Sequence, residues 1–254
     1  MIKVGVIGAS GKMGREVCQT IANTDDIELV FAVARHVGEN ICGVPLQNNF
    51  EQALKNQPVD AVVDFTHASC AADNAVLALE HGAVPIIGTS GLSEEDLSRI
   101  KKTAQSKNLP AYWIPNFAIG AVLMMKFSRE AAKYFPDAEI IEMHHNQKAD
   151  APSGTALVTA EEIAKARSAP PSPSKTEIIK LEGARGGNLK DVRIHSLRLP
   201  GLLAHQKVIF GSPGEVLTIH HDSMSRSAYM PGVLLVLRNF KKFSGLVVGL
   251  EPFL

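Results

Sequence analysis

The sequence predicts an α/β protein with two domains, a doubly wound parallel sheet followed by a smaller α+β domain with a mixed sheet. Three observations support this prediction. Short apolar runs alternate with helical patterns over residues 1–115, a glycine-rich turn directly follows the first apolar run, and the pattern changes after Pro115. The chain has 254 residues and is 45% hydrophobic, which is enough to form one large core or two modest ones.

The first part of the chain contains five short apolar runs that are typical of buried parallel strands. They are Ile2–Ile7, Ile27–Val33, Val59–Phe65, Val84–Ile87 and Ala111–Ile114. Four intervening segments have a helical pattern, namely Met13–Ala22, Phe50–Lys55, Ser69–Glu80 and Glu94–Lys107. Ser93, followed three residues later by Asp96, has the spacing of a capping box at the last of these helices. This alternation of strand and helix predicts a sheet that is covered on both faces.

The glycine-rich turn Gly8–Gly14 reads Gly-Ala-Ser-Gly-Lys-Met-Gly and joins the first strand to the first helix. Glycines allow the backbone to approach a pyrophosphate, and the N-terminus of a helix attracts its negative charge. Ser10 stands where the commoner fingerprint has its second glycine. Strand, turn and helix in this order indicate a Rossmann-type dinucleotide-binding domain, and the alternative is a tight structural turn.

Cofactor preference is indicated at the end of the second strand. A carboxylate there would bind the adenosine ribose 2′-hydroxyl, whereas a cation suits a 2′-phosphate. The chain has Arg35 at this place and no acid, so we expect NADPH to bind better than NADH, unless Arg35 simply faces solvent. The loops Phe65–His67, Gly88–Gly91 and Pro115–Ala118 follow the third, fourth and fifth strands, where we expect contacts to nicotinamide or its ribose.

The second half has a different pattern. We expect a helix at Ala121–Tyr134, a strand at Ala138–Met143, a helix at Ala156–Ala166, a Pro/Ser-rich loop at Ser168–Ser174, strands at Val192–Leu199, Val208–Phe210 and Glu215–His221, and a last helix at Arg226–Phe240. This order predicts a mixed sheet with helices on one face. The expected division is a dinucleotide-binding domain at residues 1–115, completed by 226–254, and a substrate-binding and oligomerisation domain at 116–225.

The segment Glu142–Thr155 holds most of the chemistry at the end of its strand. His144 can donate a proton near neutral pH, and Lys148 offers a positive charge or a second acid. Ser153, Gly154 and Thr155 open a helix, so their N–H groups and hydroxyls suit an anion. The set predicts a pocket for a small substrate with two negative charges that receives a proton during the reaction. The alternative is a polar loop in contact with solvent.

Composition excludes several classes of protein. The formal net charge is zero, so nothing indicates binding to nucleic acid or to an anionic membrane surface. No apolar run reaches the ~18 residues that a membrane span requires. The three cysteines form no Cys-x-x-Cys pair, and the first strand begins at Ile2 without a leader pattern. We therefore expect a cytoplasmic protein.

Metal and covalent catalysis are both disfavoured by the sequence. His144 and His145 are adjacent in a strand and point to opposite faces, and Lys148 would repel a cation, so no metal site is expected. No Gly-x-Ser-x-Gly turn is present. No cysteine lies beyond Cys70, whereas a semialdehyde dehydrogenase would need a thiolate at the nicotinamide.

Several of these segments together resemble one known family. The turn Gly8–Gly14, the loop Ile87–Gly91, Asn116–Phe117, the segment Glu142–Ala156 and the start of the last helix at Ser225–Arg226 are similar to 4-hydroxy-tetrahydrodipicolinate reductase, also called dihydrodipicolinate reductase. The similarity runs over nearly the whole chain. The resemblance implies NAD(P)H-dependent reduction of a cyclic imine dicarboxylate, derived from 4-hydroxy-tetrahydrodipicolinate, to tetrahydrodipicolinate in lysine (diaminopimelate) biosynthesis.

The resemblance also implies roles for individual residues and an assembly. His144 is the expected proton donor and acceptor, Lys148 the second donor, and His145 a substrate contact. Gly154 and Thr155, with Ser153 before them, are expected to hold a substrate carboxylate. The expected cofactor residues are Gly8, Ala9, Ser10, Gly11, Lys12, Met13, Arg35, Phe65, Thr66, Gly88, Thr89, Ser90, Pro115, Asn116, Phe117 and Ala118. The family is typically homotetrameric, with the second domain's sheets meeting across subunits.

Two positions depart from the family pattern. Ala34 replaces the acid that many members have before Arg35, which disfavours NADH, and His67 stands where some members have arginine. Two alternative functions are another two-domain Rossmann reductase and a non-catalytic NADPH-sensing regulator. A sugar reductase would leave the dianion pocket unexplained, and a regulator would be expected to lose the His144, His145 and Lys148 set.

Overall fold

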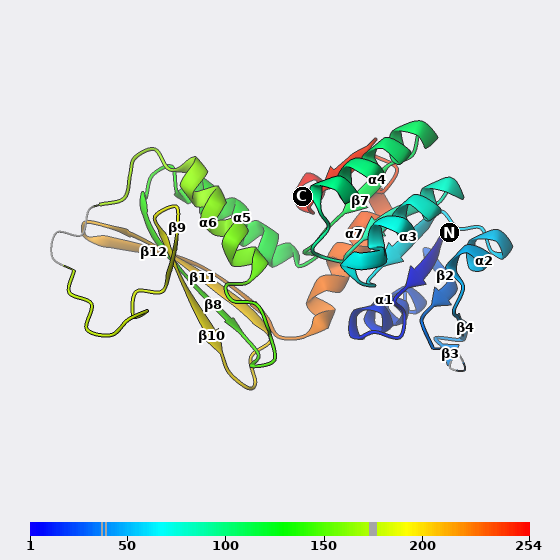
Figure 1. Ribbon diagram of the computed structural model, residues 1–254, viewed down its shortest axis with the longest axis horizontal. Coiled ribbons are helices and arrows are strands. Elements are labelled where there is room, and N and C mark those ends of the chain that lie inside the picture. The colour runs from blue at the N-terminus through cyan, green and yellow to red at the C-terminus, as the bar shows by residue number, and fades with distance from the viewer. Residues whose placement is uncertain (37, 39, 173–176) are drawn as a thin grey trace. The chain divides into compact units, whose positions relative to one another are not determined.

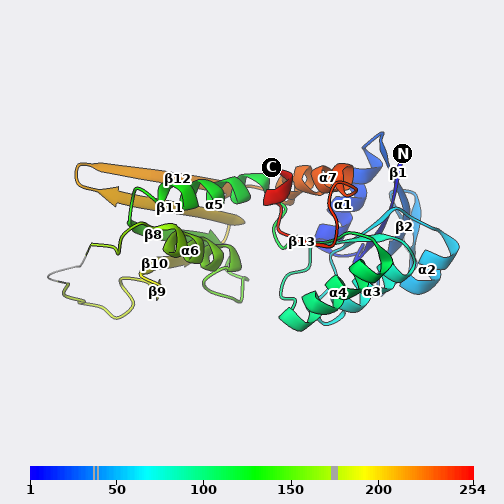
Figure 2. The same ribbon diagram turned by 90° about the horizontal axis from the view of Figure 1, so that it is seen from above.

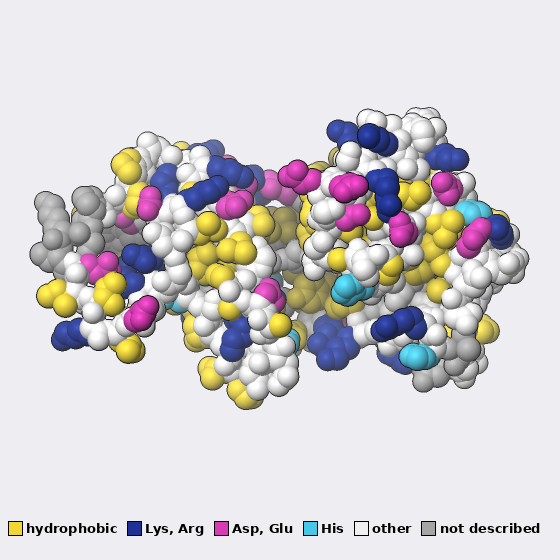
Figure 3. Space-filling view, in the orientation of Figure 1, with side chains coloured by type: hydrophobic (Ala, Val, Ile, Leu, Met, Phe, Trp, Pro, Cys, Tyr) yellow, Lys and Arg dark blue, Asp and Glu magenta, His cyan; other side chains and the backbone are white. Residues whose placement is uncertain are grey.

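The computed structural model describes residues 1–36, 38, 40–172 and 177–254. The described chain divides into two compact units, residues 1–117 with 229–254 and residues 118–228 (Figure 1). Positions 173 and 174 of the predicted Pro/Ser-rich loop lie outside the described residues. Among the residues described, no helix is long and apolar enough to cross a membrane. On the face shown in Figure 3, basic and acidic side chains are interspersed.

The first unit is built on a twisted, largely parallel sheet with the strand order β13-β7-β6-β5-β1-β2-β4-β3. The strands are β1 (Ile2–Ile7), β2 (Ile27–Val33), β3 (Asn40–Ile41), β4 (Val44–Gln47), β5 (Ala61–Asp64), β6 (Val84–Ile87), β7 (Ala111–Trp113) and β13 (Leu246–Val248). Every pair is parallel except the short hairpin of β3 and β4. The order runs outward in both directions from the neighbouring strands β1 and β5, as expected for a doubly wound sheet.

Helices cover both faces of this sheet. They are α1 (Lys12–Ala22), α2 (Phe50–Asn56), α3 (Ala68–Glu80), α4 (Glu94–Lys107) and α7 (Met230–Asn239). Helices α1 and α7 lie on one side and α3 and α4 on the other (Figure 2). The central strand β5 is buried over its whole length, which is why its sequence is a continuous apolar run up to Asp64. The predicted Rossmann-type fold is confirmed.

The second unit has a five-stranded mixed sheet with the order β12-β11-β8-β10-β9. Its strands are β8 (Asp137–His144), β9 (Gly187–Leu189), β10 (Val192–Arg198), β11 (Ala204–Ser212) and β12 (Glu215–Ser223). Strand β8 is parallel to β10 and antiparallel to β11. Helices α5 (Ile119–Ala131) and α6 (Gly154–Ala166) pack on one face, around a core that includes Ile140, Ile163 and Phe210. The predicted α+β domain is therefore confirmed.

Several element boundaries differ from the sequence expectation. Strand β11 begins at Ala204, four residues before the predicted Val208. Its first residues pair with β8 through their backbones, and because several of them are polar they show no hydrophobic pattern in the sequence. The predicted last helix is divided into a 3-10 turn, η1 (Arg226–Tyr229), and α7. The short strands β3, β4, β9 and β13, each of two to four residues, were not predicted. The chain ends in a second 3-10 turn, η2 (Glu251–Phe253).

Candidate active site

The glycine turn after β1 has no room for a side chain at two of its positions. Gly8 has φ of +75°, and a Cβ there would lie 2.4 Å from the carbonyl oxygen of Phe65. A Cβ on Gly14 would lie 2.2 Å from the carbonyl oxygen of Gly8. Gly11 is the N-cap of α1 and provides no side-chain cap, so the helix begins with backbone N–H groups that no side chain covers. The start of α1 thus presents N–H donors without a side-chain cap, which suits an anion.

A cavity of about 810 Å³ opens above this turn. Six of the predicted cofactor residues line it, namely Gly8, Ser10, Gly11, Arg35, Phe65 and Thr66. Arg35 is exposed, stands two residues after the end of β2, and lines the same cavity as the glycine turn. His67 also lines the cavity, and its ring nitrogen Nδ1 accepts a hydrogen bond from the Ser69 N–H at the start of α3.

The loops after β5 and β6 are held by one buried carboxylate that the sequence did not single out. Asp64 accepts hydrogen bonds from the N–H and hydroxyl of Thr66, from Asn74 and from the Thr89 hydroxyl. Burial raises the pKa of Asp64 against the lowering effect of these hydrogen bonds. At the end of the central strand, Asp64 therefore holds two of the three predicted nicotinamide loops, those at Thr66 and Thr89.

The remaining predicted cofactor residues lie outside the wall of this cavity. Lys12 and Met13 lie in the first turn of α1, and Ala9, within the glycine turn, is buried. Gly88, Thr89 and Ser90 follow β6, and Pro115 and Asn116 follow β7. The ring of Phe117 packs against that of Phe65 at a centroid distance of 5.7 Å, whereas Ala118 is the first residue of the second unit.

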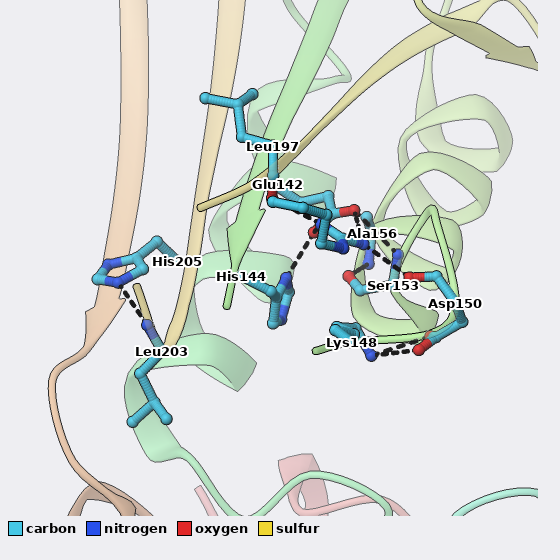
Figure 4. Close-up of polar contacts among 10 residues, drawn as sticks. Glu142, His144, Lys148, Asp150, Ser153, Ala156, Leu197, Leu203 and His205 are labelled. Atoms are coloured by element: carbon cyan, nitrogen blue, oxygen red, sulfur yellow. Dashed lines mark hydrogen bonds and ion pairs between the residues drawn. The ribbon is translucent and has the colours of Figure 1, made fainter. Parts of the chain in front are cut away.

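In the second unit, His144 is held by a buried carboxylate two residues earlier on β8. The Glu142 side chain is fully buried, and its Oε2 lies 2.5 Å from His144 Nδ1 (Figure 4). Arg198 at the end of β10 donates to both carboxylate oxygens, from Nη2 to Oε1 at 2.7 Å and from Nη1 to Oε2 at 3.0 Å. Residues two apart on a strand share a face, which places the His144 ring beside Glu142, and His145 follows the end of β8.

Glu142 is strongly stabilised as a carboxylate. Its burial alone would raise the pKa, but hydrogen bonds from His144, Arg198 and Ser196 outweigh this effect and lower the pKa to about 2. Near neutral pH the side chain is therefore ionised and can only accept hydrogen bonds. It was missed as a functional residue, although its position two residues before His144 on the same strand face was a usable signal. Arg198 gave no such signal, because it is 56 residues away from Glu142.

Lys148 and the start of α6 lie beside this group. The ammonium of Lys148 contacts both oxygens of the exposed Asp150 carboxylate, at 2.7 and 2.9 Å (Figure 4). Ser153 is buried, and its hydroxyl caps α6 by accepting from the Ala156 N–H. Gly154 is exposed, with open space where a Cβ would lie. The site therefore combines an imidazole, an ammonium and the N-terminus of a helix.

The low pKa of Glu142 predicts a specific loss of stability in acid. A carboxyl group whose pKa falls from 4.5 to about 2 on folding stabilises the fold above about pH 4.5, and loses this effect as the pH falls toward 2. The Glu142→Gln variant lacks this effect at every pH. We expect the stability difference between wild type and variant in urea unfolding to shrink by roughly 2–3 kcal/mol between pH 7 and pH 2.5. An equal difference at both pH values would contradict a depressed pKa.

Comparison with known proteins connects both units to one family. The chain matches the family model "Dihydrodipicolinate reductase, N-terminus" over residues 2–117 and the model "Dihydrodipicolinate reductase, C-terminus" over residues 120–254. It is 48% identical over 263 residues to the 4-hydroxy-tetrahydrodipicolinate reductase of Desulfitobacterium hafniense, covering 100% of this chain and 98% of the relative. The corresponding enzyme of Halalkalibacterium halodurans is 46% identical over 260 residues, covering 99% and 98%.

Solved structures agree with this result. A dihydrodipicolinate reductase from Paenisporosarcina sp. TG-14, solved with dipicolinate bound, superposes with a TM-score of 0.91 at 40% identity over 100% of both chains. A probable dehydrogenase from Thermotoga maritima reaches a TM-score of 0.67 at 12% identity, with 99% of this chain and 92% of that chain covered, and shares only the fold. The resemblance seen in the sequence is confirmed, and the chain belongs to the dihydrodipicolinate reductase family.

Proposed function

We infer that this chain is an oxidoreductase of lysine biosynthesis that reduces 4-hydroxy-tetrahydrodipicolinate, as its cyclic imine, to tetrahydrodipicolinate with NAD(P)H. The observation that carries this inference is full-length similarity to reductases of that name, in a chain whose candidate proton donor contacts a buried carboxylate. Membership of this family argues against the non-catalytic regulator and the unrelated two-domain reductase. The relative solved with dipicolinate bound also supports a small cyclic dicarboxylate as substrate.

The first unit fits a dinucleotide. The glycine turn admits no side chain at Gly8 or Gly14, the start of α1 offers backbone donors, and the adjoining cavity contains Arg35. We propose that these residues hold the pyrophosphate and the adenosine ribose, and that the loops organised by Asp64 hold the nicotinamide end, together with residues 115–118. When bound, the reduced nicotinamide supplies a hydride to the substrate ring.

We propose that NADPH is preferred over NADH. Arg35 is exposed at the end of β2 and lines the cofactor cavity, and the position before it is the buried Ala34, which offers no carboxylate to a 2′-hydroxyl. A guanidinium matches a phosphate both in charge and in hydrogen-bond geometry. The adenosine 2′-phosphate of NADPH therefore gains a partner that NADH cannot use.

The second unit provides the acid and the anion site. We propose that His144 donates the proton that completes the reduction. After the substrate's 4-hydroxyl leaves as water, hydride addition to the conjugated C=C–C=N system pushes electron density toward the ring nitrogen, and the resulting enamine-like intermediate takes up this proton. Lys148 provides a positive charge or a second proton after leaving Asp150, and the N–H groups at Gly154 and Thr155 bind a substrate carboxylate. Ser153 shapes this anion site through its cap, and His145 contacts the substrate.

We also propose that the enzyme is a cytoplasmic homotetramer. Among the described residues the cysteines Cys18, Cys42 and Cys70 are all free, which agrees with a reducing compartment. Helices α5 and α6 cover one face of the second sheet only. The other face exposes Leu197 and Val216, with 71% of Val216 exposed in the single chain, and an apolar sheet face of this kind favours contacts between subunits.

Replacement of His144 tests the assigned acid. We expect His144→Ala to lower kcat by about 10²–10⁴-fold, since general acid catalysis contributes that much, with little change in the affinity for NADPH. The substrate is the product of dihydrodipicolinate synthase, and the assay follows NADPH absorbance. His81→Ala, on the exposed end of α3, is the control. Wild-type turnover in His144→Ala would remove His144 from this role.

Replacement of Arg35 tests cofactor preference. The variant Arg35→Ala loses a charge-assisted contact to the 2′-phosphate, which corresponds to an increase of about 10- to 100-fold in KM for NADPH. The KM for NADH should change little, so the measured quantity is the ratio of the two kcat/KM values. Arg99→Ala, on the outside of α4, should keep the wild-type ratio. A parallel loss with both cofactors would show that Arg35 does not distinguish them.

The assembly is tested by light scattering. A mass four times that of the chain is expected, and the exposed sheet face predicts that Val216→Asp lowers it, because a buried unpaired charge is costly. Val248→Asp places the same charge on β13 of the first unit, where Val248 is 52% exposed, and should leave the mass unchanged. A wild-type mass equal to one chain would contradict the tetramer.

A further inference from the structure

The carboxylate of Glu142 is fully buried and accepts hydrogen bonds from four residues, His144, Ser196, Arg198 and Ser153. Oε2 lies 2.5 Å from His144 Nδ1 and 3.0 Å from Arg198 Nη1. Oε1 lies 2.7 Å from Arg198 Nη2 and 3.3 Å from the backbone nitrogen of Ser153. A carboxylate has about four lone-pair positions, so these contacts, together with the hydrogen bond from Ser196, use its full accepting capacity. The four contacts come from the second residue after Glu142 on β8, from β10, and from the start of α6.

This arrangement decides which nitrogen of His144 carries the fixed proton. An ionised carboxylate has no hydrogen to give, so the short contact between Glu142 and His144 requires the proton to lie on Nδ1. Nε2 is then the nitrogen that gains and loses a proton. The low pKa of Glu142 agrees with this reading, because the carboxylate stays ionised throughout the working range of an imidazole.

The terminal nitrogens of Arg198 are fully engaged by protein acceptors. Its two terminal nitrogens both contact Glu142, and they also donate to the carbonyl oxygens of Leu197 and Asp150. The parallel register of β8 and β10, with Arg198 opposite His144, brings the guanidinium to this place. These terminal N–H groups are therefore not available to a substrate carboxylate, and the Nε–H of Arg198 is buried without a partner among the described residues. Arg198 therefore balances the charge of Glu142 and ties the loop at Asp150 to the sheet.

The fourth contact connects the acid to the anion site. The N–H of Ser153, the residue that caps α6, donates to Glu142 Oε1, while the Ser153 hydroxyl accepts from Ala156. The same carboxylate thus holds both the N-terminus of α6 and the His144 ring in place. A displacement of Glu142 would move both the proton donor and the proposed carboxylate cradle.

We propose that Glu142 is a positioning residue that fixes His144 in the Nδ1–H tautomer, with Nε2 as the exchangeable site, and sets the start of α6 relative to that ring. This proposal rests on the proposed function, in which His144 is the acid. A carboxylate that fixes the far nitrogen of a catalytic imidazole is a recurring arrangement in enzymes, and its loss leaves the wrong tautomer. A purely structural carboxylate would hold the strands together without controlling the tautomer.

A second glutamate–histidine pair on the same two strands provides a matched control. Glu139 Oε2 lies 2.8 Å from Nε2 of His195 and accepts from Arg185, so it has the same kinds of partner as Glu142. The Glu139 side chain is 36% exposed, and its residue lies three positions from Glu142, on the opposite face of β8. It has no contact with His144 or with the start of α6 among the described residues.

The first measurement is the ¹⁵N spectrum of the wild-type enzyme labelled on histidine, with the His144 signals identified by their loss in His144→Gln. We expect the neutral ring to carry its proton on Nδ1. In Glu142→Gln, which keeps the shape but loses the charge, this preference should disappear, whereas Glu139→Gln should keep it. A wild-type ring protonated on Nε2 overturns the proposal, and this result does not depend on whether any Glu142 variant folds.

The second measurement is kinetic. Glu142→Gln should lower kcat by about 10- to 100-fold, as expected for a residue that orients a catalytic ligand or base, with a smaller change in the KM for NADPH. Glu139→Gln should keep the wild-type kcat. Failure of the proposed function would appear as no reduction by the wild-type enzyme, or as full activity in His144→Ala. A slow His144→Ala enzyme beside a fully active, folded Glu142→Gln enzyme would overturn only the role of Glu142.

Discussion

The ionised carboxylate of Glu142 is the interaction on which the candidate site depends. A buried charge is tolerated only where partners replace its lost hydration, and here an arginine, a histidine and a backbone N–H do so. Because those partners come from two strands and a helix start, the carboxylate determines where all three meet. In the proposed function this constraint fixes the proton on one nitrogen of His144, and the other nitrogen exchanges protons.

The first unit follows a similar rule with a different group. Asp64, at the end of the central strand, accepts hydrogen bonds from residues of two loops and one helix, so that a single carboxylate shapes the edge of the sheet where a dinucleotide fits. The glycine turn completes this edge by steric means, since neither Gly8 nor Gly14 has room for a Cβ. Both units therefore place buried acids at the carboxyl ends of strands, where parallel sheets form ligand sites.

Much of the fold could be predicted because its elements are long or chemically marked. The strands Ile2–Ile7, Ile27–Val33 and Val84–Ile87 and the helix Glu94–Lys107 have the predicted bounds, and Ser93 and Asp96 form the predicted capping box. Strand β11 was too short in the prediction because its polar first half is held by pairing with β8, which no local pattern records. The motif of His144, Lys148 and Ser153 could be recognised in the sequence from its residue types. The hydrogen bonds of Glu142 and Arg198 that hold it could not.

The sequence by itself determined the family, the fold class and the residues able to move a proton or bind an anion, because these depend on residue type, spacing and periodicity. Only the tertiary structure decided that Glu142 and Arg198 meet beneath His144, that Lys148 contacts Asp150, and that the Ser153 hydroxyl caps α6. Arg198 reaches Glu142 through the register of two parallel strands that are far apart in the chain. Such a contact depends on how the strands are placed in space, and it cannot be predicted from the local sequence.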